Sequence, residues 1–172
     1  GIDRTNYNLP YGQNELIDEI LKVNENTGII LISGNAVAMP WINKIPAIIQ
    51  SWYLGSEAGN ATANIISGIA NPSGKLPFSI PVKLEDNGAH HLGAESYPGD
   101  SINVVYKEDI FVGYRWHDTK RIAPLFPFGY GLSYTTFDYG KLTVDKKEYC
   151  KDDVINVSFN IKNSGNKNGA EI

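Results

Sequence analysis

The feature that most constrains the fold is a short, β-branched apolar run at residues 28–33, which reads GIILIS. A strand that is apolar on both faces is typical of a parallel sheet covered by helices. A second apolar strand is predicted over residues 45–52, after a helical turn at residues 41–44. Amphipathic helices are predicted over residues 13–24 and from an N-cap at Ser56. This order predicts an α/β fold, a layered parallel-type sheet flanked by helices.

The rest of the chain changes character near Phe137. Residues 75–80 are predicted to form one more strand, residues 81–103 a loop, and residues 104–116, with alternating apolar and aromatic residues, a strand that carries Arg115. Beyond Phe137, Leu142 and Val144 come first. Ile155, Val157, Phe159 and Ile161 then alternate with polar residues, the period of a half-buried antiparallel strand. We interpret this tail as the first hairpin of a β-sandwich.

Composition excludes several classes of function. The net charge of −4 and pI near 5.3 leave no basic footprint for nucleic acid. No apolar run approaches the roughly 18 residues of a membrane span. One cysteine, Cys150, excludes an internal disulfide framework. The only methionine is Met39, so we expect the chain to be a piece of a longer protein.

Two groups of residues imitate binding motifs. Residues 68–75 (GIANPSGK) resemble a phosphate loop, but the spacer has one residue too many and follows a predicted helix instead of preceding one. His90 and His91 with Glu95, or His117 with Asp118, could supply metal ligands, but neither set forms a recognised ligand motif. No metal site is therefore predicted.

Carboxylates are the more informative candidates. Glycosyl transfer with retention needs two of them, about 5 Å apart. The candidates are Asp3, Glu57, Glu108 and Asp109. Glu57 would complement the dipole of its predicted helix, and Glu108 or Asp109 could pair with Arg115. The residues by themselves favour a structural role for each of these side chains.

A series of short motifs runs through the whole chain in a characteristic order. They are GIDR at 1–4 with LP at 9–10, SGN at 33–35 with PW at 40–41, WYLGSEAG at 52–59, NPSGKLP at 71–77 with Pro81, VY at 105–106 with GYR at 113–115, FPFGYGLSY at 126–134, and NSG at 163–165 with Gly169. Together they make the chain resemble the C-terminal region of family 3 glycoside hydrolases, the β-glucosidase and β-xylosidase group.

The resemblance implies a domain arrangement. Members of this family pair a TIM-like barrel with an α/β sandwich, often followed by a fibronectin type III-like domain. Residues 1–134 would be the latter part of the α/β sandwich domain, incomplete at its N-terminus. Residues 135–172 would be the truncated start of an all-β fibronectin type III-like sandwich.

The resemblance also implies where catalysis takes place. The family's aspartate nucleophile lies in the barrel, and its acid/base glutamate in many members directly precedes the Gly-x-Asp-Arg motif, which is residues 1–4 here. Both catalytic residues are thus expected upstream of Gly1, and none in this chain. Asp3 and Arg4 are the substrate-proximal candidates, because Arg4 could orient the acid/base loop or adjust the pKa of its glutamate.

The function implied is that of a fragment of a retaining β-glycosidase, most simply a β-glucosidase that needs no cofactor. The expected partners are an oligosaccharide or β-glucoside substrate and the N-terminal barrel of the same chain, with no nucleic acid and no membrane. Secretion or periplasmic location is favoured for the parent. The fragment would supply scaffold and one wall of the cleft, and would be inactive alone. A β-xylosidase, a non-catalytic carbohydrate-binding module and a flavodoxin-like nucleotide binder remain as alternatives.

Overall fold

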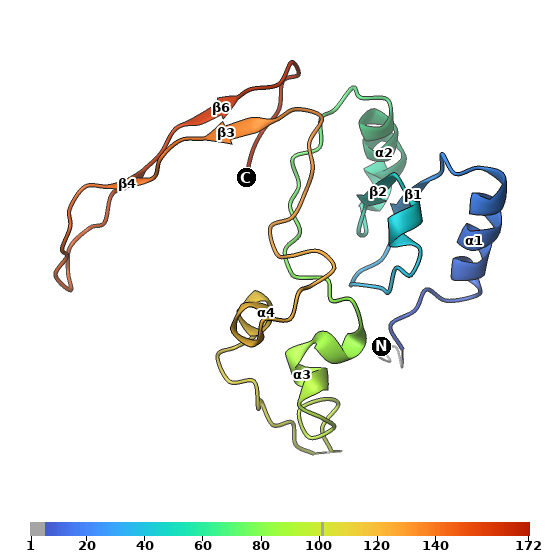
Figure 1. Cartoon of the computed structure of the whole chain (residues 1–172), viewed down its shortest axis with the longest axis horizontal. Coiled ribbons are helices and arrows are strands. Elements are labelled where there is room, and N and C mark those ends of the chain that lie inside the picture. The colour runs from blue at the N-terminus through green and yellow to red at the C-terminus, as the bar shows by residue number, and fades with distance from the viewer. Residues whose placement is uncertain (1–5, 101) are drawn as a thin grey trace. The chain divides into compact units, whose positions relative to one another are not determined.

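The computed structural model describes residues 6–100 and 102–172 (Figure 1). It is a mixed α/β structure with small sheets and helices. The chain divides into two compact units. Unit 1 comprises the chain up to Thr62 together with Leu76–Tyr130, and unit 2 comprises Ala63–Lys75 together with Gly131–Ile172.

Unit 1 is built around a pair of parallel strands. Strands β1 (Gly28–Leu31) and β2 (Ala47–Gln50) pair in a register that places Gly28 opposite Ala47 and Leu31 opposite Gln50. Helix α1 (Gln13–Val23) precedes β1, and the 3-10 turn η1 (Ile42–Lys44) leads into β2 (Figure 1). The predicted helix, strand, helical turn and second strand are therefore confirmed, and so is the parallel pairing.

The core of unit 1 lies beside these strands. Its buried side chains are Leu31, Val37, Met39, Trp41 and Ile80, and Trp41 is only 1% exposed. Leu9 and Ile17 pack against this cluster from the N-terminal segment and from α1. The segment between β1 and η1 thus supplies three of these five side chains, Val37, Met39 and Trp41. Burial of apolar surface drives folding in proportion to its area.

The second predicted helix begins later than expected. Helix α2 (Ala58–Ile66) follows a 3-10 turn, η2 (Gly55–Glu57). Ser56 lies inside that turn and does not cap the helix. The positive φ of 69° at Gly55 sets the tight entry, a conformation that glycine adopts without a steric penalty.

The strand predicted over residues 75–80 is wrong as a full strand. The segment runs antiparallel to residues 125–130 with scattered bonds: the Leu76 amide donates to the Tyr130 carbonyl at 2.8 Å, and the Ile80 amide to the Phe126 carbonyl at 2.8 Å. Only the Ile80–Phe126 bridge is regular. Pro77 and Pro127 have no amide hydrogen, so a continuous ladder cannot form.

The segment between these two stretches is more helical than predicted. It contains η3 (Leu84–Asp86), α3 (Gly88–His91) and α4 (Tyr114–Lys120). The predicted strand that carries Arg115 is wrong, because Gly113 (φ 62°) turns the chain and α4 starts there. The helix buries two adjacent side chains, Trp116 and His117, and this burial overrides the alternating pattern.

Unit 2 contains the predicted hairpin. Strand β3 (Phe137–Tyr139) pairs antiparallel with β6 (Ile161–Asn163), and β4 (Thr143–Val144) with β5 (Val157–Ser158) (Figure 1). The pairing is confirmed, but the half-buried face is not formed in this chain. Phe159 and Ile161 are 48% and 47% exposed.

Candidate functional site

The carboxyl ends of β1 and β2 meet at one edge of the parallel pair, where residues 32–40 and residues 51–54 form two loops. In open α/β sheets, ligands bind outside the carboxyl ends of the strands. This edge is therefore the part of the described chain best placed to contribute to a site.

Hydrogen bonds fix the first of these loops. The Ser33 hydroxyl donates to the Asn35 carbonyl at 2.8 Å. The Gln50 side-chain amide reaches both the carbonyl and the hydroxyl of Ser33 at 3.4 Å. Beside it the Ser51 amide donates to the Leu31 carbonyl at 2.9 Å. The loop after β1 is thereby tied to the end of β2.

Two aromatic residues form the second loop. Trp52 has a positive φ of 54° and packs its ring edge-on to Phe78, with centroids 5.4 Å apart. Tyr53 is 78% exposed and covers Gly34, where an added Cβ would come 2.6 Å from the tyrosine ring. An exposed ring held over a glycine is a surface on which an apolar face of a ligand can lie.

The N-terminal segment is fastened to this same edge. The Ala38 amide donates to the Tyr7 carbonyl at 2.8 Å, and the Tyr7 hydroxyl donates to the Pro81 carbonyl at 3.0 Å. Asp3 and Arg4, the predicted substrate-proximal residues, lie outside the described residues. Sequence reasoning missed Tyr7, because its hydroxyl partner is 74 residues away and no local pattern indicates such a contact.

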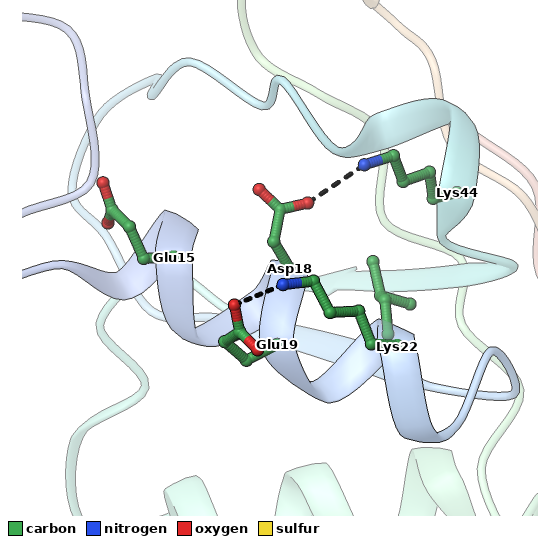
Figure 2. Close-up of a pocket in the computed structure, with 6 residues that line it drawn as sticks. Glu15, Asp18, Glu19, Lys22 and Lys44 are labelled. Atoms are coloured by element: carbon green, nitrogen blue, oxygen red, sulfur yellow. Dashed lines mark hydrogen bonds and ion pairs between the residues drawn. The ribbon is translucent and has the colours of Figure 1, made fainter.

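A shallow hollow lies between α1 and the η1 turn, and Figure 2 shows its charged lining. Asp18 accepts a bond from Lys44 at 3.0 Å, Glu19 pairs with Lys22 at 2.5 Å, and Glu15 points away from both lysines. These ion pairs are exposed, and such pairs contribute about 0–1 kcal/mol each. Of these pairs only Asp18–Lys44 connects α1 to another segment, and the Trp41 indole adds a second connection by donating to the Asn14 side chain at 2.9 Å.

The remaining carboxylate candidates make no hydrogen bond or ion pair with the two loops at the edge of β1 and β2 among the contacts of the described residues. Glu57 is exposed and accepts a bond from Asn60 at 2.7 Å. Glu108 is buried, and its Oε2 has no partner among the described residues. Asp109 sits in a turn with a φ of 54°. Arg115 lies over the Tyr114 ring, 5.3 Å from its centroid, and the described residues show no ion pair between it and either acid.

Ordinary contacts engage most of the candidate metal ligands, although the buried Nδ1 of His90 has no hydrogen-bond partner among the described residues. His90 lies against Tyr97, and the His91 ring nitrogen is 3.3 Å from the Glu85 carbonyl. His117 contacts the Ile122 carbonyl at 3.0 Å. Glu95 pairs with Lys107, whose hydrogen bond and charge lower the pKa of that carboxyl. Within residues 6–100 and 102–172, no group of three histidine, cysteine or acidic side chains could hold a metal ion.

The segment that resembles a phosphate loop has a structural role in unit 2. Asn71 accepts bonds from the Ser133 hydroxyl at 2.9 Å and from the Tyr134 amide at 2.7 Å, and donates to the Asn168 carbonyl at 2.9 Å. Lys75 donates to the Gly131 carbonyl at 2.8 Å and pairs with Glu171 at 3.2 Å. With its lysine engaged in this way, the segment has no free cation for a phosphate.

None of the described helices is long and apolar enough to cross a bilayer.

The family model of the glycosyl hydrolase family 3 C-terminal domain matches residues 1–134. The chain belongs to this family. The resemblance of its motifs to family 3 glycoside hydrolases is thereby confirmed.

Relatives of this family 3 chain are named as β-glucosidases. A β-glucosidase of Bacteroides ovatus is 59% identical over 172 residues, which is 100% of this chain and 23% of that protein. A thermostable β-glucosidase of Acetivibrio thermocellus is 45% identical, over 100% of this chain and 22% of that protein. The chain thus spans about a fifth of the length of the relatives it matches.

Solved structures agree with this family assignment. The crystal structure of a β-glucosidase from Streptomyces venezuelae in complex with D-glucose matches with a TM-score of 0.89 and 40% identity. The match covers 96% of this chain and 21% of that one. The likeness includes the hairpin tail as well as the strands and helices of unit 1.

Proposed function

We propose that this chain is the C-terminal part of a retaining β-glucosidase, a hydrolase of terminal β-linked glucose that needs no cofactor. The observation that carries the proposal is the match along the whole chain, at 59% identity, to a protein named as a β-glucosidase. A β-xylosidase and a carbohydrate-binding module are less favoured, because the relatives described above share the name β-glucosidase.

The proposed chemistry needs catalytic residues that lie outside this 172-residue sequence. A retaining enzyme holds a nucleophile and an acid/base about 5–5.5 Å apart across the scissile bond. We place both upstream of Gly1, the nucleophile in a barrel and the acid/base directly before residues 1–4. Asp3 and Arg4 then follow the acid closely, where a guanidinium would hold the pKa of a nearby carboxyl down. The described edge loops would form one wall of the cleft.

The proposed domain boundary lies between residues 134 and 135. Residues 1–134 would be the latter part of an α/β sandwich, with a layered parallel sheet flanked by helices, and residues 135–172 would begin a fibronectin type III-like sandwich. Two observations support this: the family model ends at residue 134, and the paired strands from β3 onward are all antiparallel. The proposed partners are the barrel of the same chain and a β-glucoside or oligosaccharide.

The test compares three proteins on an aryl β-glucoside: the full-length protein, the full-length protein with the glutamate before Gly1 changed to glutamine, and the isolated 172-residue chain. We expect turnover from the first and a loss of about 10²–10⁴-fold from the second, the usual contribution of a positioned acid. The isolated chain should show none. Turnover of xylosides in preference to glucosides, or activity of the isolated chain, would contradict the proposal.

A further inference from the structure

The segment that follows Asp3 and Arg4 is held at three points. The Tyr7 carbonyl accepts the Ala38 amide at 2.8 Å, and the Tyr7 hydroxyl donates to the Pro81 carbonyl at 3.0 Å. Two residues later, Leu9 packs against the hydrophobic core. A backbone contact, a side-chain contact and an apolar contact therefore all fix the same short stretch.

The two hydrogen-bond partners of Tyr7, Ala38 and Pro81, belong to the most buried part of unit 1. Ala38 stands between Val37 and Met39, which are 1% and 5% exposed. Pro81 is buried and follows Ile80, which is 2% exposed. Close-packed protein interiors deform little. A residue that is hydrogen-bonded to both partners therefore has a fixed position relative to the edge of β1 and β2.

We propose that Tyr7 is a positioning residue for the acid/base glutamate. This inference rests on the proposed function, which places that glutamate directly before Gly1, seven residues upstream of Tyr7. Seven residues span at most about 25 Å, so a fixed Tyr7 limits the region that the acid can reach. The hydroxyl bond to Pro81 sets the downstream end of that tether against the core.

The position of the acid matters first in the step that breaks the glycosidic bond. In the first step the acid gives its proton to the glycosidic oxygen as the bond from that oxygen to the anomeric carbon breaks, and the nucleophile forms the new bond to that carbon. The acid is left as a carboxylate and recovers a proton from water in the second step. Tyr7 exchanges no proton and touches no substrate; it keeps the acid in reach of the leaving oxygen.

The test uses the full-length protein with Tyr7→Phe, which keeps the ring and removes the hydroxyl. Since kcat/KM reports the first step, it is measured for a poor leaving group, methyl β-glucoside or cellobiose, and for a good one, dinitrophenyl β-glucoside. Poor leaving groups need the proton and good ones do not. We expect a fall of about tenfold for the poor leaving group and less than about twofold for the good one.

The matched control is Tyr11→Phe, since Tyr11 is 97% exposed. This variant should leave kcat/KM unchanged for both substrates. Leu9→Ala, which releases another of the three contacts, should give the same selective loss, so the inference does not depend on one variant folding. Thermal unfolding measured in parallel identifies any general loss of folded protein. Such a loss would lower kcat/KM equally for both substrates.

An equal loss on both leaving groups, or no loss in either variant, would overturn the positioning role. A full-length wild-type protein that hydrolyses no β-glucoside would instead overturn the proposed function itself. The two failures are therefore distinguishable in the same set of assays.

Discussion

Unit 1 and unit 2 are stabilised by different kinds of interaction. Unit 1 contains the buried apolar side chains of the described residues, from Leu31 to Trp116. In unit 2 the buried residue is a threonine, Thr135, whose hydroxyl donates to Asn163 at 2.7 Å. Unit 1 is thus held by apolar volume, and unit 2 by particular donors and acceptors around Asn71 and Lys75.

This difference has a general consequence for mutations. An apolar core loses stability in proportion to the volume removed from it. A hydrogen-bonded network loses it whenever one partner is removed and the other is left without a bond. Substitutions chosen to delete volume or to delete single polar atoms should therefore separate the two units.

The largest effect is expected for Trp41→Ala. The side chain is 1% exposed and its indole bonds Asn14, so the change opens a cavity and leaves an acceptor unpaired. We expect a loss of about 3–5 kcal/mol in the free energy of unfolding. Hydrogen exchange in the full-length protein should rise over residues 28–50, while Tyr11→Ala, at a fully exposed site, leaves it unchanged. Unchanged exchange in the Trp41 variant would break the comparison.

A smaller loss is expected for Asn71→Ala in unit 2. The change deletes three hydrogen bonds and leaves Ser133, Tyr134 and Asn168 to find water, at a cost of about 1–3 kcal/mol. Exchange should rise over residues 131–139. Asn43→Ala, a change at an exposed asparagine of unit 1, is the control. If the loss were as small as in this control, the network would not be what stabilises unit 2.

Acid should weaken unit 2 through Glu171. The Tyr139 hydroxyl donates to this carboxylate at 2.7 Å and Lys75 lies 3.2 Å away, and both lower the pKa of Glu171 in the folded state. Because the folded-state pKa is the lower one, the stabilisation is complete above the ordinary glutamate pKa of about 4.3 and is lost as the pH falls through the folded value.

The same contact raises the pKa of Tyr139, chiefly because its phenol donates to Glu171. That contribution is present below the ordinary tyrosine pKa of about 10 and is lost as the pH rises through the higher folded value. Protonation of Glu171 should therefore increase exchange over the paired residues 137–139 and 161–163 on acidification below about pH 4. Glu171→Gln should remove this acid dependence, and Asp138→Asn, at an exposed site on β3, should preserve it. An unchanged acid response in Glu171→Gln would contradict the assignment.

The smallest effect is expected for Gly34→Ala. The new methyl group would come 2.6 Å from the Tyr53 ring, but that ring is exposed and can swing away, so the loss should stay below about 1 kcal/mol. Adding Tyr53→Ala should cancel it, as a double-mutant cycle on unfolding would show. A penalty that persists in the double variant would locate the strain in the backbone of the loop.

Local periodicity predicted some elements well and failed at others for identifiable reasons. The apolar stripe of α1 and the β-branched run of β1 are local signals, and both elements lie where they were predicted. The strand predicted over residues 75–80 failed because Pro77 and Pro127 interrupt its ladder. The strand predicted over residues 104–116 failed because Gly113 and the burial of Trp116 favour a helix.

The sequence alone determined the family and the paired strands of β1 and β2, because motif order and residue periodicity are properties of neighbouring residues. Only the tertiary structure decided that Tyr7 is bonded to Ala38 and Pro81. It also decided that Asn71 and Lys75 belong to a hydrogen-bond network and do not form a phosphate site. Those contacts join residues far apart in the chain, and their energies depend on burial and on distance, which a linear sequence does not contain.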